Sequence, residues 1–546
     1  MPDSSNIAEA LRVQAGERPD ELALIVPLRR GADGRWADRR WTWRELNDLS
    51  DRLATGLQRR GIAAGTRVAF MVPPSLEFFA LFFALFKAGC VPVLIDPGIG
   101  LKPLKACLAE ARPSVFIGVT RAQVARIMFG WARGHIRRCI TVGPRFFGAG
   151  LRYRDLLTEN ATAFEPPKTD PEAPAAILFT SGSTGIPKGV VYRHRHFIAQ
   201  VDLVRKTYGI RPGEVDLPTF PPFALFDPAL GMTTVIPKMD FTRPARANPE
   251  MLVSLIGQYK VTNLFGSPAL MNTLSRHLQA HSANLPGVRR ALSAGAPVSP
   301  AVVERMHLAL DASADIHTPY GATECLPVAT IAGRELVGEL SAGNRAGKGI
   351  CVGQPLQANR IRIIRITDQA LARLEDSREV ASGETGEICV AGPTVTDKYW
   401  RRDAQTRLAK MVDEEGTIWH RMGDLGWIDA AGRLWYCGRK SERVITADGT
   451  LYTECVEGIV NAVRGVYRSA LVGIGPEACR TPAVVIEPES GQRKASLIAR
   501  VAGRLAEHAD TRTIQRIEIC KSLPVDIRHN AKIQRGRVAD WLNGKR

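Results

Sequence analysis

The sequence predicts an α/β protein with a large N-terminal domain and a small C-terminal α+β domain. Its 546 residues are too many for a single hydrophobic core. Apolar, strand-like runs alternate with helix-like segments up to residue 324, which is the order of parallel α/β layers. The pattern changes near residue 350 and again after residue 440. Hydrophobic residues make up 45% of the chain and charged residues 23%, so disordered and fibrous classes are excluded.

The N-terminal part begins with a predicted helix and a strand–helix–strand unit. Over residues 41–61, leucines at helical spacing form one stripe, and Gly61 is a suitable stop. Residues 67–72 and 90–96 are typical of buried strands, and the segment LEFFALFFALFKAG at 76–89 is typical of a helix. The strand pattern is repeated at 114–119 and 138–143.

The middle of the chain continues the α/β pattern after a proline-rich linker at 165–175. A predicted strand at 176–180 leads into a glycine-rich turn. Further strand-like runs lie at 261–266, 289–297 and 315–324. Residues 350–440 hold short β-like runs between Gly and Asp turns, which predicts a small β-barrel-like part or a distorted sheet. Beyond them, β-like runs and an amphipathic helix near 494–509 predict the separate α+β domain.

Basic residues outnumber acidic ones, 73 against 55, which gives a net charge of +18. They are scattered along the chain as short pairs, and the sequence has no recognition helix, zinc finger or RNA-binding aromatic signature. Nucleic-acid binding is therefore not expected. The charge indicates a solvated basic surface that attracts an anionic nucleotide, or a negatively charged protein partner.

The sequence indicates a cytoplasmic protein with no transmembrane segment. Its ten cysteines are dispersed, with no CxxC pair, as expected for reduced core residues. The N-terminus lacks the basic start and apolar core of a signal peptide. The most apolar run, FFALFFALF at 78–86, is too short to span a bilayer and predicts a buried helix.

The stretch ILFTSGSTGIPKGVV at 177–191 is the strongest chemical signal in the chain. Backbone N–H groups in a Ser/Thr/Gly turn, together with hydroxyl groups, make a concave site for phosphate oxygens, and Lys188 adds a positive charge. The spacing around Lys188 differs from that of a Walker loop, and Ser181 stands where a serine-hydrolase elbow needs glycine. GNRAGKG at 343–349 has too short a Walker-like spacing, so it predicts a surface loop.

Five motifs follow one another along the chain: TSGSTGIPKGV at 180–190, YGATE at 320–324, HRMGDLGWID at 420–429, GRKSERVI at 438–445 and DIRHNAKIQR at 526–535. In this order they resemble the signatures of the adenylate-forming superfamily, which includes acyl-CoA synthetases, luciferases and peptide-synthetase adenylation domains. Met422 stands where that family usually has threonine. The resemblance implies cleavage of ATP to AMP and pyrophosphate. It also implies an N-terminal domain at 1–438, a hinge at 439–441 and a mobile C-terminal domain at 442–546.

The resemblance further implies a nucleotide site built from these motifs. Tyr320 and Gly321 would contact the nucleotide. Asp424 would accept hydrogen bonds from both ribose hydroxyls, and Arg439 would assist it. The small residues that would pack on adenine are Gly295, Ala296 and Pro297. The residues that would hold the β- and γ-phosphates of ATP are Thr180, Ser181, Gly182, Ser183, Thr184, Gly185 and Lys188.

Three more residues would act at the reacting centre. Glu324 would bind Mg²⁺, a hard cation that prefers carboxylate oxygen. Thr323 would touch the α-phosphate, and Lys532 would bridge the substrate carboxylate and that phosphate. Attack of a carboxylate on phosphorus brings two anions together, and cations such as Lys532 and Lys188 would offset that repulsion.

The second half-reaction is suggested by the segments FPPFALFDPALGMTTVIP at 220–237 and KVTNLFGSPALMNTLSRH at 260–277. The amino-acid sequences of these two segments resemble those of the β-lactone synthetases of bacterial long-chain olefin biosynthesis. This implies a long-chain 2-alkyl-3-hydroxy fatty acid as substrate, and a β-lactone decarboxylase and a reductase as partners. His194 and Lys532 are candidate bases for the 3-hydroxyl group. Two alternatives stay open: a long-chain acyl-CoA synthetase and a catalytically inactive nucleotide-binding relative.

Overall fold

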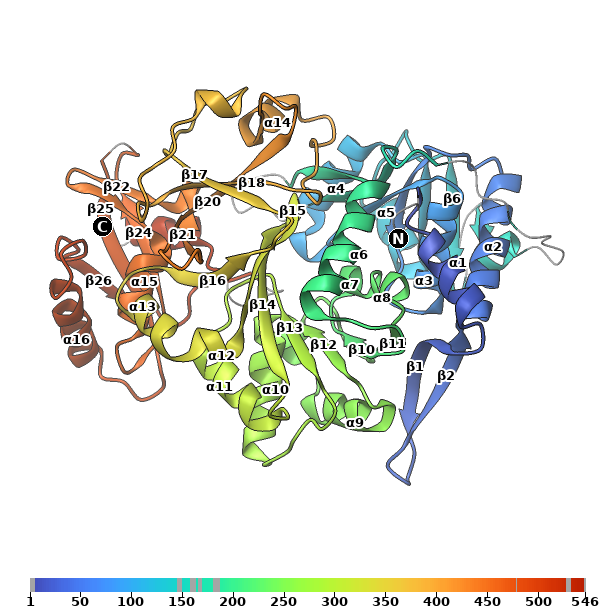
Figure 1. Ribbon diagram of the computed structural model, residues 1–546, viewed down its shortest axis with the longest axis horizontal. Coiled ribbons are helices and arrows are strands. Elements are labelled where there is room, and N and C mark those ends of the chain that lie inside the picture. Colours follow the sequence, from blue (N-terminus) through green and yellow to red (C-terminus); the bar gives the residue numbers. More distant parts are fainter. Residues whose placement is uncertain are drawn as a thin grey trace.

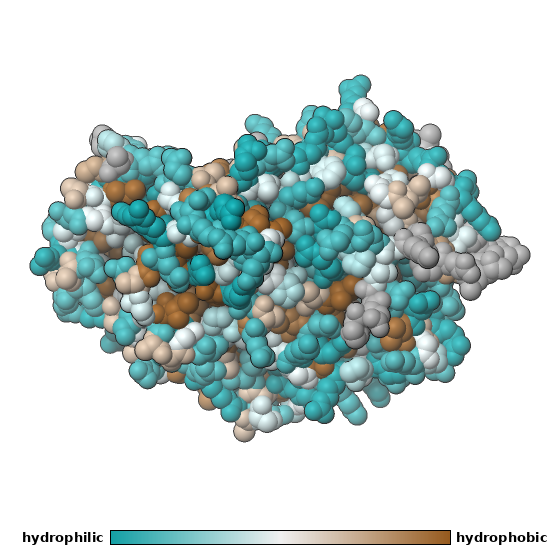
Figure 2. Space-filling view, turned by 45° about the horizontal axis from the view of Figure 1, so that its top comes forward, coloured by the Kyte–Doolittle hydropathy of each residue, from teal (hydrophilic) through white to brown (hydrophobic). Residues whose placement is uncertain are grey.

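The computed structural model describes residues 5–144, 150–157, 164, 169–179, 187–477, 479–526 and 532–544. Figure 1 shows the N-terminal elements at one end of the long axis and the C-terminal elements at the other, with the strands of the largest sheet between them. Figure 2 shows one face of the molecule, on which hydrophilic residues cover most of the surface and hydrophobic residues gather across the hollowed middle. The predicted α/β class is confirmed.

A seven-stranded sheet forms the first layer, in the order β7-β6-β5-β3-β4-β8-β9. All of its neighbouring strands are parallel except the pair β8–β9. The bounds are β3 Arg67–Met71, β4 Val91–Ile95, β5 Val115–Val119, β6 Arg138–Val142, β7 Leu151–Arg152, β8 Pro174–Phe179 and β9 Gly189–Arg193. The helices between its strands include α4 (Leu101–Ala111) and α5 (Thr120–Met128).

The apolar run at 78–86 lies inside a buried helix, α3 (Leu76–Lys87), as predicted. The hydroxyl of Ser75 caps this helix by accepting from the backbone N–H of Phe78 at 3.2 Å. Every residue from Phe78 to Lys87 is buried, and α2 (Trp43–Arg59) packs beside α3 in the same core. Within the described ranges, no helix is long and apolar enough to cross a membrane.

A fourteen-stranded sheet forms the second layer, and it changes character along its width. Its parallel part runs through β1 (Leu22–Arg30), β11 (Thr233–Val235), β10 (Val215–Pro218), β12 (Asn263–Gly266), β13 (Arg290–Ser293) and β14 (Asp315–Ala322). At one end β2 (Trp36–Thr42) pairs with β1 in an antiparallel hairpin. Helices α9 (Pro249–Tyr259), α10 (Pro268–Ala280) and α11 (Pro300–Ala309) pack on this sheet around a second core.

The β-like runs of residues 350–440 continue this sheet as its antiparallel end. The antiparallel end begins before this stretch, with β15 (Cys325–Ala332). It continues with β16 (Ile350–Pro355), β21 (Leu434–Arg439), β20 (Ile418–Ile428), β18 (Gly386–Ala391), β17 (Arg360–Ile364) and β19 (Lys410–Val412). They surround a smaller core that includes Val328, Ile388 and Met422. The change in sequence pattern near residue 350 therefore follows the change from parallel to antiparallel strand pairing in this sheet.

The C-terminal elements build a separate small sheet of β24 (Val466–Ile474), β25 (Thr481–Pro488) and β26 (Arg516–Ile519). Helices α15 (Thr453–Asn461), α16 (Lys494–Ala506) and α17 (Arg535–Asn543) accompany it. The sheet and helices enclose their own apolar clusters, as an α+β unit requires.

Two expectations about loops and cysteines need correction. Residues 343–349 are not simply a surface loop, because the first three belong to helix α13 (Ser341–Arg345). This helix packs against α15, where a Cβ at Gly458 would stand 2.5 Å from the carbonyl of Asn344. All ten cysteines are free, as predicted, but Cys479 is exposed because it lies in the turn after β24 rather than in a core.

Candidate functional site

The motif YGATE forms the end of β14 and a two-residue turn into the antiparallel strand β15. Ala322 pairs with Cys325, so Thr323 and Glu324 are the two turn residues. A Cβ at Gly321 would stand 2.8 Å from the carbonyl oxygen of Cys325, which explains why the motif needs glycine there. The turn therefore presents Thr323 and Glu324 at the edge of the large sheet.

Side chains from neighbouring segments fix this turn. The hydroxyl of Tyr399 donates to Glu324 Oε1 at 2.6 Å, and burial raises the pKa of that hydroxyl. Thr396 donates to the backbone carbonyl of Glu324 from both its N–H, at 2.9 Å, and its hydroxyl, at 3.0 Å. Tyr192 donates to the carbonyl of Thr323 at 2.5 Å. The Glu324 carboxylate is thus held in place by neighbours that are largely buried.

Lys188 lies beside this turn, with its Nζ 4.8 Å from the centre of the Tyr399 ring. It follows the predicted phosphate loop, whose residues Thr180, Ser181, Gly182, Ser183, Thr184 and Gly185 lie outside the described residues. The flanking strands show where that loop begins and ends, because Phe179 of β8 pairs with Gly189 of β9. Val190 in turn forms a β-bridge with Tyr399. The structure therefore brings the base of the loop to Glu324.

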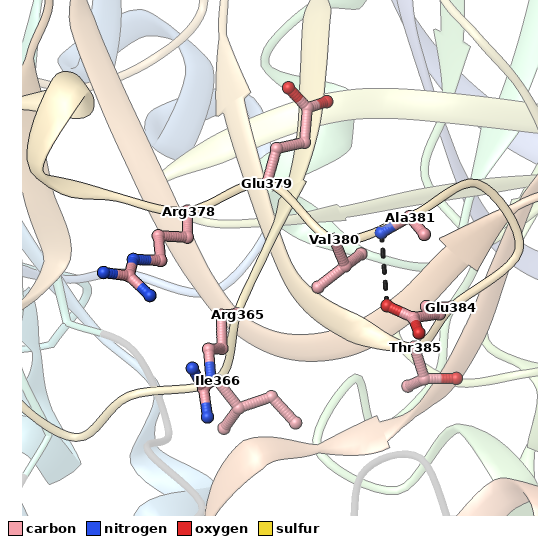
Figure 3. Close-up of a pocket in the computed structure, with 8 residues that line it drawn as sticks. All are labelled: Arg365, Ile366, Arg378, Glu379, Val380, Ala381, Glu384 and Thr385. Atoms are coloured by element: carbon pink, nitrogen blue, oxygen red, sulfur yellow. Dashed lines mark hydrogen bonds between the residues drawn. The ribbon is translucent and has the colours of Figure 1, made fainter.

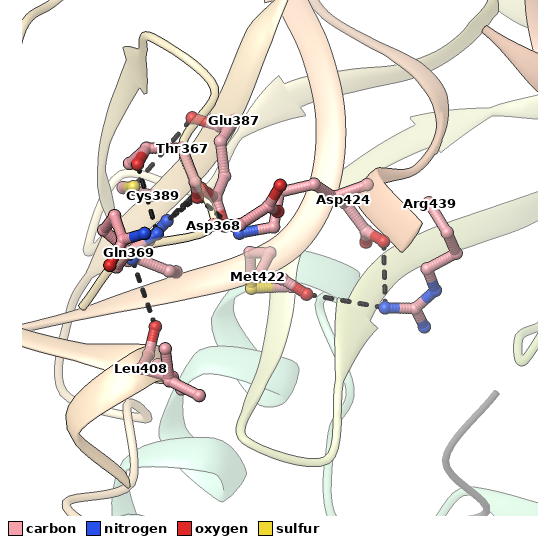
Figure 4. A network of polar contacts seen from close by, with 12 residues as sticks. Thr367, Asp368, Gln369, Glu387, Cys389, Leu408, Met422, Asp424 and Arg439 are labelled. Carbon is pink, nitrogen blue, oxygen red and sulfur yellow. Dashed lines mark hydrogen bonds and ion pairs between the residues drawn. The ribbon is translucent and has the colours of Figure 1, made fainter. Parts of the chain in front are cut away.

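Asp424 and Arg439 face each other across the neighbouring strands β20 and β21. The guanidinium of Arg439 lies 2.9 Å from Asp424 Oδ1 (Figure 4). The hydroxyl of Tyr320 donates to Asp424 Oδ2 at 2.7 Å. Burial raises the pKa of Asp424, while the charges of Arg439 and Lys532 act in the opposite direction. Tyr320 thus links this carboxylate to the strand that carries Thr323 and Glu324.

The turn at 294–297 leaves the sheet at the same edge. Strands β12, β13 and β14 are parallel neighbours, so the residues after their carboxyl ends lie side by side. Gly295 has φ +98°, a left-handed conformation that favours glycine, and it is exposed. Ala296 is half-buried and Pro297 exposed. These small residues leave room above the sheet next to Tyr320.

An aromatic cluster lies at the adjacent strand end. The rings of Phe223 and Phe265 are stacked with their centres 4.0 Å apart, and Phe220 stacks on Phe265 at 5.9 Å. Phe226 also packs near Phe223, at 6.2 Å. These phenylalanines are only partly buried except for Phe265, so they offer an apolar surface beside the nucleotide residues.

Lys532 approaches from the C-terminal unit. Its backbone is held by Asp526, which accepts from the Lys532 N–H at 3.0 Å and donates its own N–H to the Lys532 carbonyl at 3.0 Å. The residue is exposed, and its charge is close enough to Asp424 to affect the pKa of that carboxyl. The structure therefore gathers Lys188, Glu324, Asp424, Arg439 and Lys532 from five separated motifs.

His194 does not join this group, so its interpretation as a candidate base was wrong. Its ring is buried against Phe86, and its Nδ1 accepts a hydrogen bond from the backbone N–H of Ile7 at 3.3 Å. Burial lowers its pKa to about 4. The histidine holds the N-terminal segment to the core, a role that depends on a contact 187 residues away in sequence.

Sequence reasoning also missed buried residues behind Glu324. Lys410 is buried with its Nζ 3.4 Å from the hydroxyl of Thr396, and burial lowers its pKa to about 8 although the charge of Glu324 opposes this. His420 is buried nearby, and burial, together with the charge of Lys410, lowers its pKa. Lys410 lies outside the five motifs, whereas His420 opens the motif HRMGDLGWID, four residues before Asp424, but was assigned no role. The strand pairing of β19 and β20 places Lys410 opposite His420.

An ion-pair network supports the junction with the C-terminal unit (Figure 4). Glu387 and Arg421 form a 2.6 Å ion pair in which each side chain is only 1% exposed. Lys440, just after Arg439, pairs with the other oxygen of Glu387 at 2.9 Å. The guanidinium of Arg421 also donates to the carbonyls of Gln369, Thr367 and Leu408. This network anchors the start of the segment that follows β21.

Two cavities of about 500 Å³ lie elsewhere on the surface and contain none of the predicted site residues. One is lined by Arg365, Ile366, Arg378, Glu379, Val380, Ala381, Glu384 and Thr385 (Figure 3). The other lies beside the stacked rings of Trp427 and Trp435. The converging charged groups, rather than the cavities, therefore identify the candidate site.

Comparisons with known proteins indicate a family for the chain. A family model described as "AMP-binding enzyme" matches residues 11–400. The "Olefin beta-lactone synthetase" of Stenotrophomonas maltophilia is 50% identical over 99% of this chain and 98% of its own length. A "Long-chain-fatty-acid--CoA ligase" of Salmonella typhimurium is 26% identical over 85% of each chain. Among solved structures, the amide bond synthetase McbA from Marinactinospora thermotolerans has a TM-score of 0.80 at 21% identity, covering 98% of this chain and 99% of that one.

Glu387→Ala is expected to destabilise the protein strongly. It leaves the guanidinium of Arg421 buried without its carboxylate, which costs about 3–5 kcal/mol of the free energy of unfolding. Urea unfolding followed by tryptophan fluorescence measures the change. Glu375→Ala is the matched control, because its ion pair with Arg373 is largely exposed and should contribute less than about 1 kcal/mol. Equal losses in the two variants would contradict the role of the buried network.

Proposed function

The chain belongs to the AMP-binding enzyme family, and we propose that it is an ATP-dependent β-lactone synthetase acting on a long-chain 2-alkyl-3-hydroxy fatty acid. One observation carries the choice within the family. The similarity to an olefin beta-lactone synthetase reaches 50% identity over nearly the full length of both chains, against 26% for a long-chain-fatty-acid–CoA ligase. The partly exposed phenylalanine cluster beside the charged residues suits an acid with long alkyl chains.

In this proposal the first half-reaction makes an acyl adenylate. An oxygen of the substrate carboxylate attacks the α-phosphorus of ATP, and the bond to the bridging oxygen of the β-phosphate breaks to release pyrophosphate. Lys532 bridges the carboxylate and the α-phosphate, and Thr323 contacts that phosphate. Residues 180–185 and Lys188 hold the β- and γ-phosphates. The cations offset the repulsion between the two anions as charge moves to the leaving group.

The nucleotide itself would be held by the strand ends around β14. Asp424 accepts from the ribose hydroxyls with Arg439 beside it, and Gly295, Ala296 and Pro297 pack on adenine together with Tyr320 and Gly321. The short ion pair between Asp424 and Arg439 supports this assignment, because the charge of Arg439 opposes the effect of burial on the pKa of Asp424 and so favours the carboxylate form that accepts hydrogen bonds.

The position of the Glu324 carboxylate is suitable for a Mg²⁺ ligand. Among the described residues, no group of three or more His, Cys, Asp or Glu side chains could hold a metal alone. Mg²⁺ in such enzymes needs only one or two carboxylates, because substrate phosphates and water complete its shell. The Glu324 carboxylate accepts a hydrogen bond from Tyr399 on one oxygen and is half-buried beside Lys188. When bound, the ion would neutralise charge on the phosphates.

The second half-reaction would close the ring without another substrate. The 3-hydroxyl oxygen attacks the acyl carbonyl carbon, the bond from that carbon to the AMP oxygen breaks, and AMP leaves with the electron pair. Holding both groups on one molecule favours this attack by proximity, which offsets part of the strain of a four-membered ring. With His194 buried away from the site, Lys532 is the remaining one of the two candidates for the base, and it would accept the hydroxyl proton only in its neutral form, after giving up the charge that serves adenylation. A β-lactone decarboxylase and a reductase are the proposed partners.

The hinge at 439–441 would let the C-terminal unit, 442–546, turn between the two half-reactions. The charge of Lys532 reaches Asp424 in this structure, so the present arrangement suits adenylation. Lys440 is tied to Glu387 of the N-terminal unit, whereas Glu442 is tied to Arg535 of the C-terminal unit at 2.7 Å. The chain therefore passes within three residues, 440–442, from an ion pair with the N-terminal unit to an ion pair within the C-terminal unit.

Lys532→Ala should slow adenylation roughly a hundred- to a thousand-fold, because removing one oriented group from the reacting centre costs about 3–4 kcal/mol. Pyrophosphate release measures this step, and equilibrium binding should show that ATP affinity is largely retained. Lys521→Ala is the matched control, because it removes an exposed lysine from the same C-terminal unit. Adenylation at the parental rate in Lys532→Ala would show that the assignment is wrong.

Product analysis separates a β-lactone synthetase from an acyl-CoA synthetase. With ATP, Mg²⁺ and a long-chain 2-alkyl-3-hydroxy acid, and without CoA, β-lactone and AMP should accumulate over many turnovers. A matched acid without the 3-hydroxyl should stop after about one pyrophosphate per site, because no internal nucleophile can displace AMP. Chromatography and mass spectrometry identify the products. A thioester, or an absolute need for CoA, would overturn the lactone proposal, and ADP as product would overturn adenylation.

Ser441→Pro should slow lactone formation while sparing the first release of pyrophosphate, because proline restricts the backbone at the proposed joint. A single-turnover experiment measures both products in one reaction. Ser441→Ala, which removes the same hydroxyl without restricting φ, should behave like the parent. If lactone and pyrophosphate appear at parental rates in Ser441→Pro, then rotation at this joint is not required.

A further inference from the structure

The outward face of α5 carries large apolar side chains that nothing in the described chain covers. Val124 is 43% exposed, Ile127 60% and Met128 69%. Leu101, at the start of α4, is 52% exposed. Isolated exposed hydrophobic residues are ordinary, but three on one face of a short helix are not explained by packing. We call Leu101, Val124, Ile127 and Met128 the apolar ridge.

Helices α4 and α5 cover the same face of the seven-stranded sheet. Their inner residues, such as Leu104 and Leu108 of α4 and Ala122 and Ala125 of α5, pack in one core cluster. Figure 1 shows the two helices near each other at the edge of the N-terminal part. The Nζ of Lys105 would lie 4.0 Å from a Cβ at Gly130, just after α5, so the basic residues of α4 lie next to the end of α5.

The surroundings of the ridge are strongly basic. From 97 to 144 the chain contains eight Lys and Arg residues but only one acidic residue, Glu110. That carboxylate is paired with Arg402 at 2.6 Å, so it does not neutralise the surface. Two other carboxylates lie close by. Asp96, five residues before Leu101, accepts from the backbone N–H of Gly98 at 2.9 Å. The pKa of Asp240 is lowered first by a hydrogen bond from Thr242 and, to a smaller extent, by the charge of Arg121. The exposed basic residues around the ridge are Lys102, Lys105, Arg121 and Arg133.

We propose that the α4–α5 face docks reversibly on an anionic lipid bilayer. Exposed apolar side chains on the same two helices as exposed Lys and Arg match such a surface, because the apolar groups enter the headgroup–acyl boundary while the basic groups meet lipid phosphates. A solvated helix face would not need Ile127 and Met128, and a second copy of this chain would bring like charges together. If the proposed function holds, docking also places the enzyme where its poorly soluble acid and lactone partition, but the docking itself does not depend on that function.

Vesicle co-sedimentation of the full chain tests this proposal. The protein should bind vesicles of equal parts phosphatidylcholine and phosphatidylglycerol, and much less those of phosphatidylcholine alone. Raising the salt from about 0.1 M to about 1 M should release it, because the screening length falls from ~10 Å to ~3 Å. Lys102→Glu with Lys105→Glu should weaken binding at least roughly tenfold, since each basic residue near the surface contributes severalfold. Ile127→Asp with Met128→Asp should weaken it at least roughly tenfold through lost apolar burial.

Matched controls distinguish an effect of the α4–α5 face from a general effect of surface charge or surface hydrophobicity. Leu308→Asp removes a leucine that is 73% exposed on α11, and Arg493→Glu with Lys494→Glu reverses two exposed charges near α16. Both should bind vesicles like the parent, and adenylation of a soluble acid shows that each variant is folded. Equal binding by the α4–α5 variants and the parent, or no preference for anionic vesicles, would overturn the proposal. So would sedimentation showing that the face mediates self-association without vesicles, since the occupant would then be a second copy.

Discussion

The turn between β14 and β15 is the point on which the arrangement of the site depends, because two sheets meet there. Tyr192 reaches it from β9 of the seven-stranded sheet. Thr396 and Tyr399 reach it from the segment after β18, in which Tyr399 forms a β-bridge with Val190 of β9. Each such hydrogen bond contributes only about 1 kcal/mol net, but an unpaired buried partner costs more. The turn can therefore shift only if both sheets shift, and Glu324 is fixed relative to Lys188 on one side and Asp424 on the other.

The charges around this turn are unequal, and the imbalance suits an anionic ligand. Lys188, Lys410, Arg439 and Lys532 surround the two carboxylates Glu324 and Asp424. Burial lowers the pKa of Lys410 to about 8 and raises the pKa of Asp424. In each case burial favours the uncharged form of the side chain. A polyphosphate that enters among these residues would stabilise the charged lysines. Binding and protonation are therefore linked at this site.

The sequence was sufficient for most elements and for the residues of recognised motifs. The strand-like runs at 67–72 and 261–266 contain β3 and β12 in the structure. Short apolar segments of this kind, bounded by turns, strongly favour buried strands. Tyr192, Tyr399 and Lys410 were not predicted, since nothing local distinguishes them from core residues until the sheets are assembled. His194 was misjudged for the same reason, because its partner Ile7 is distant in sequence. The assigned phosphate-loop residues 180–185 stay predictions.

The attachments around Ser441 have a mechanical consequence. Lys440 is fastened to the buried Glu387, and Glu442 to Arg535, which also pairs with Glu457 at 2.7 Å. At the proposed hinge a single residue, Ser441, stands between these two anchors, so a change of its two torsion angles would reorient the proposed C-terminal unit, 442–546. A change of a few tens of degrees at such a pivot would move a distant side chain by many ångströms, and it would also have to separate α15 from α13 and β21, on which it packs. Arg443 also spans this pivot, through a hydrogen bond to the carbonyl of Lys440 at 2.7 Å and an ion pair with the exposed Asp368 at 2.5 Å. An ion pair with so exposed a carboxylate contributes little.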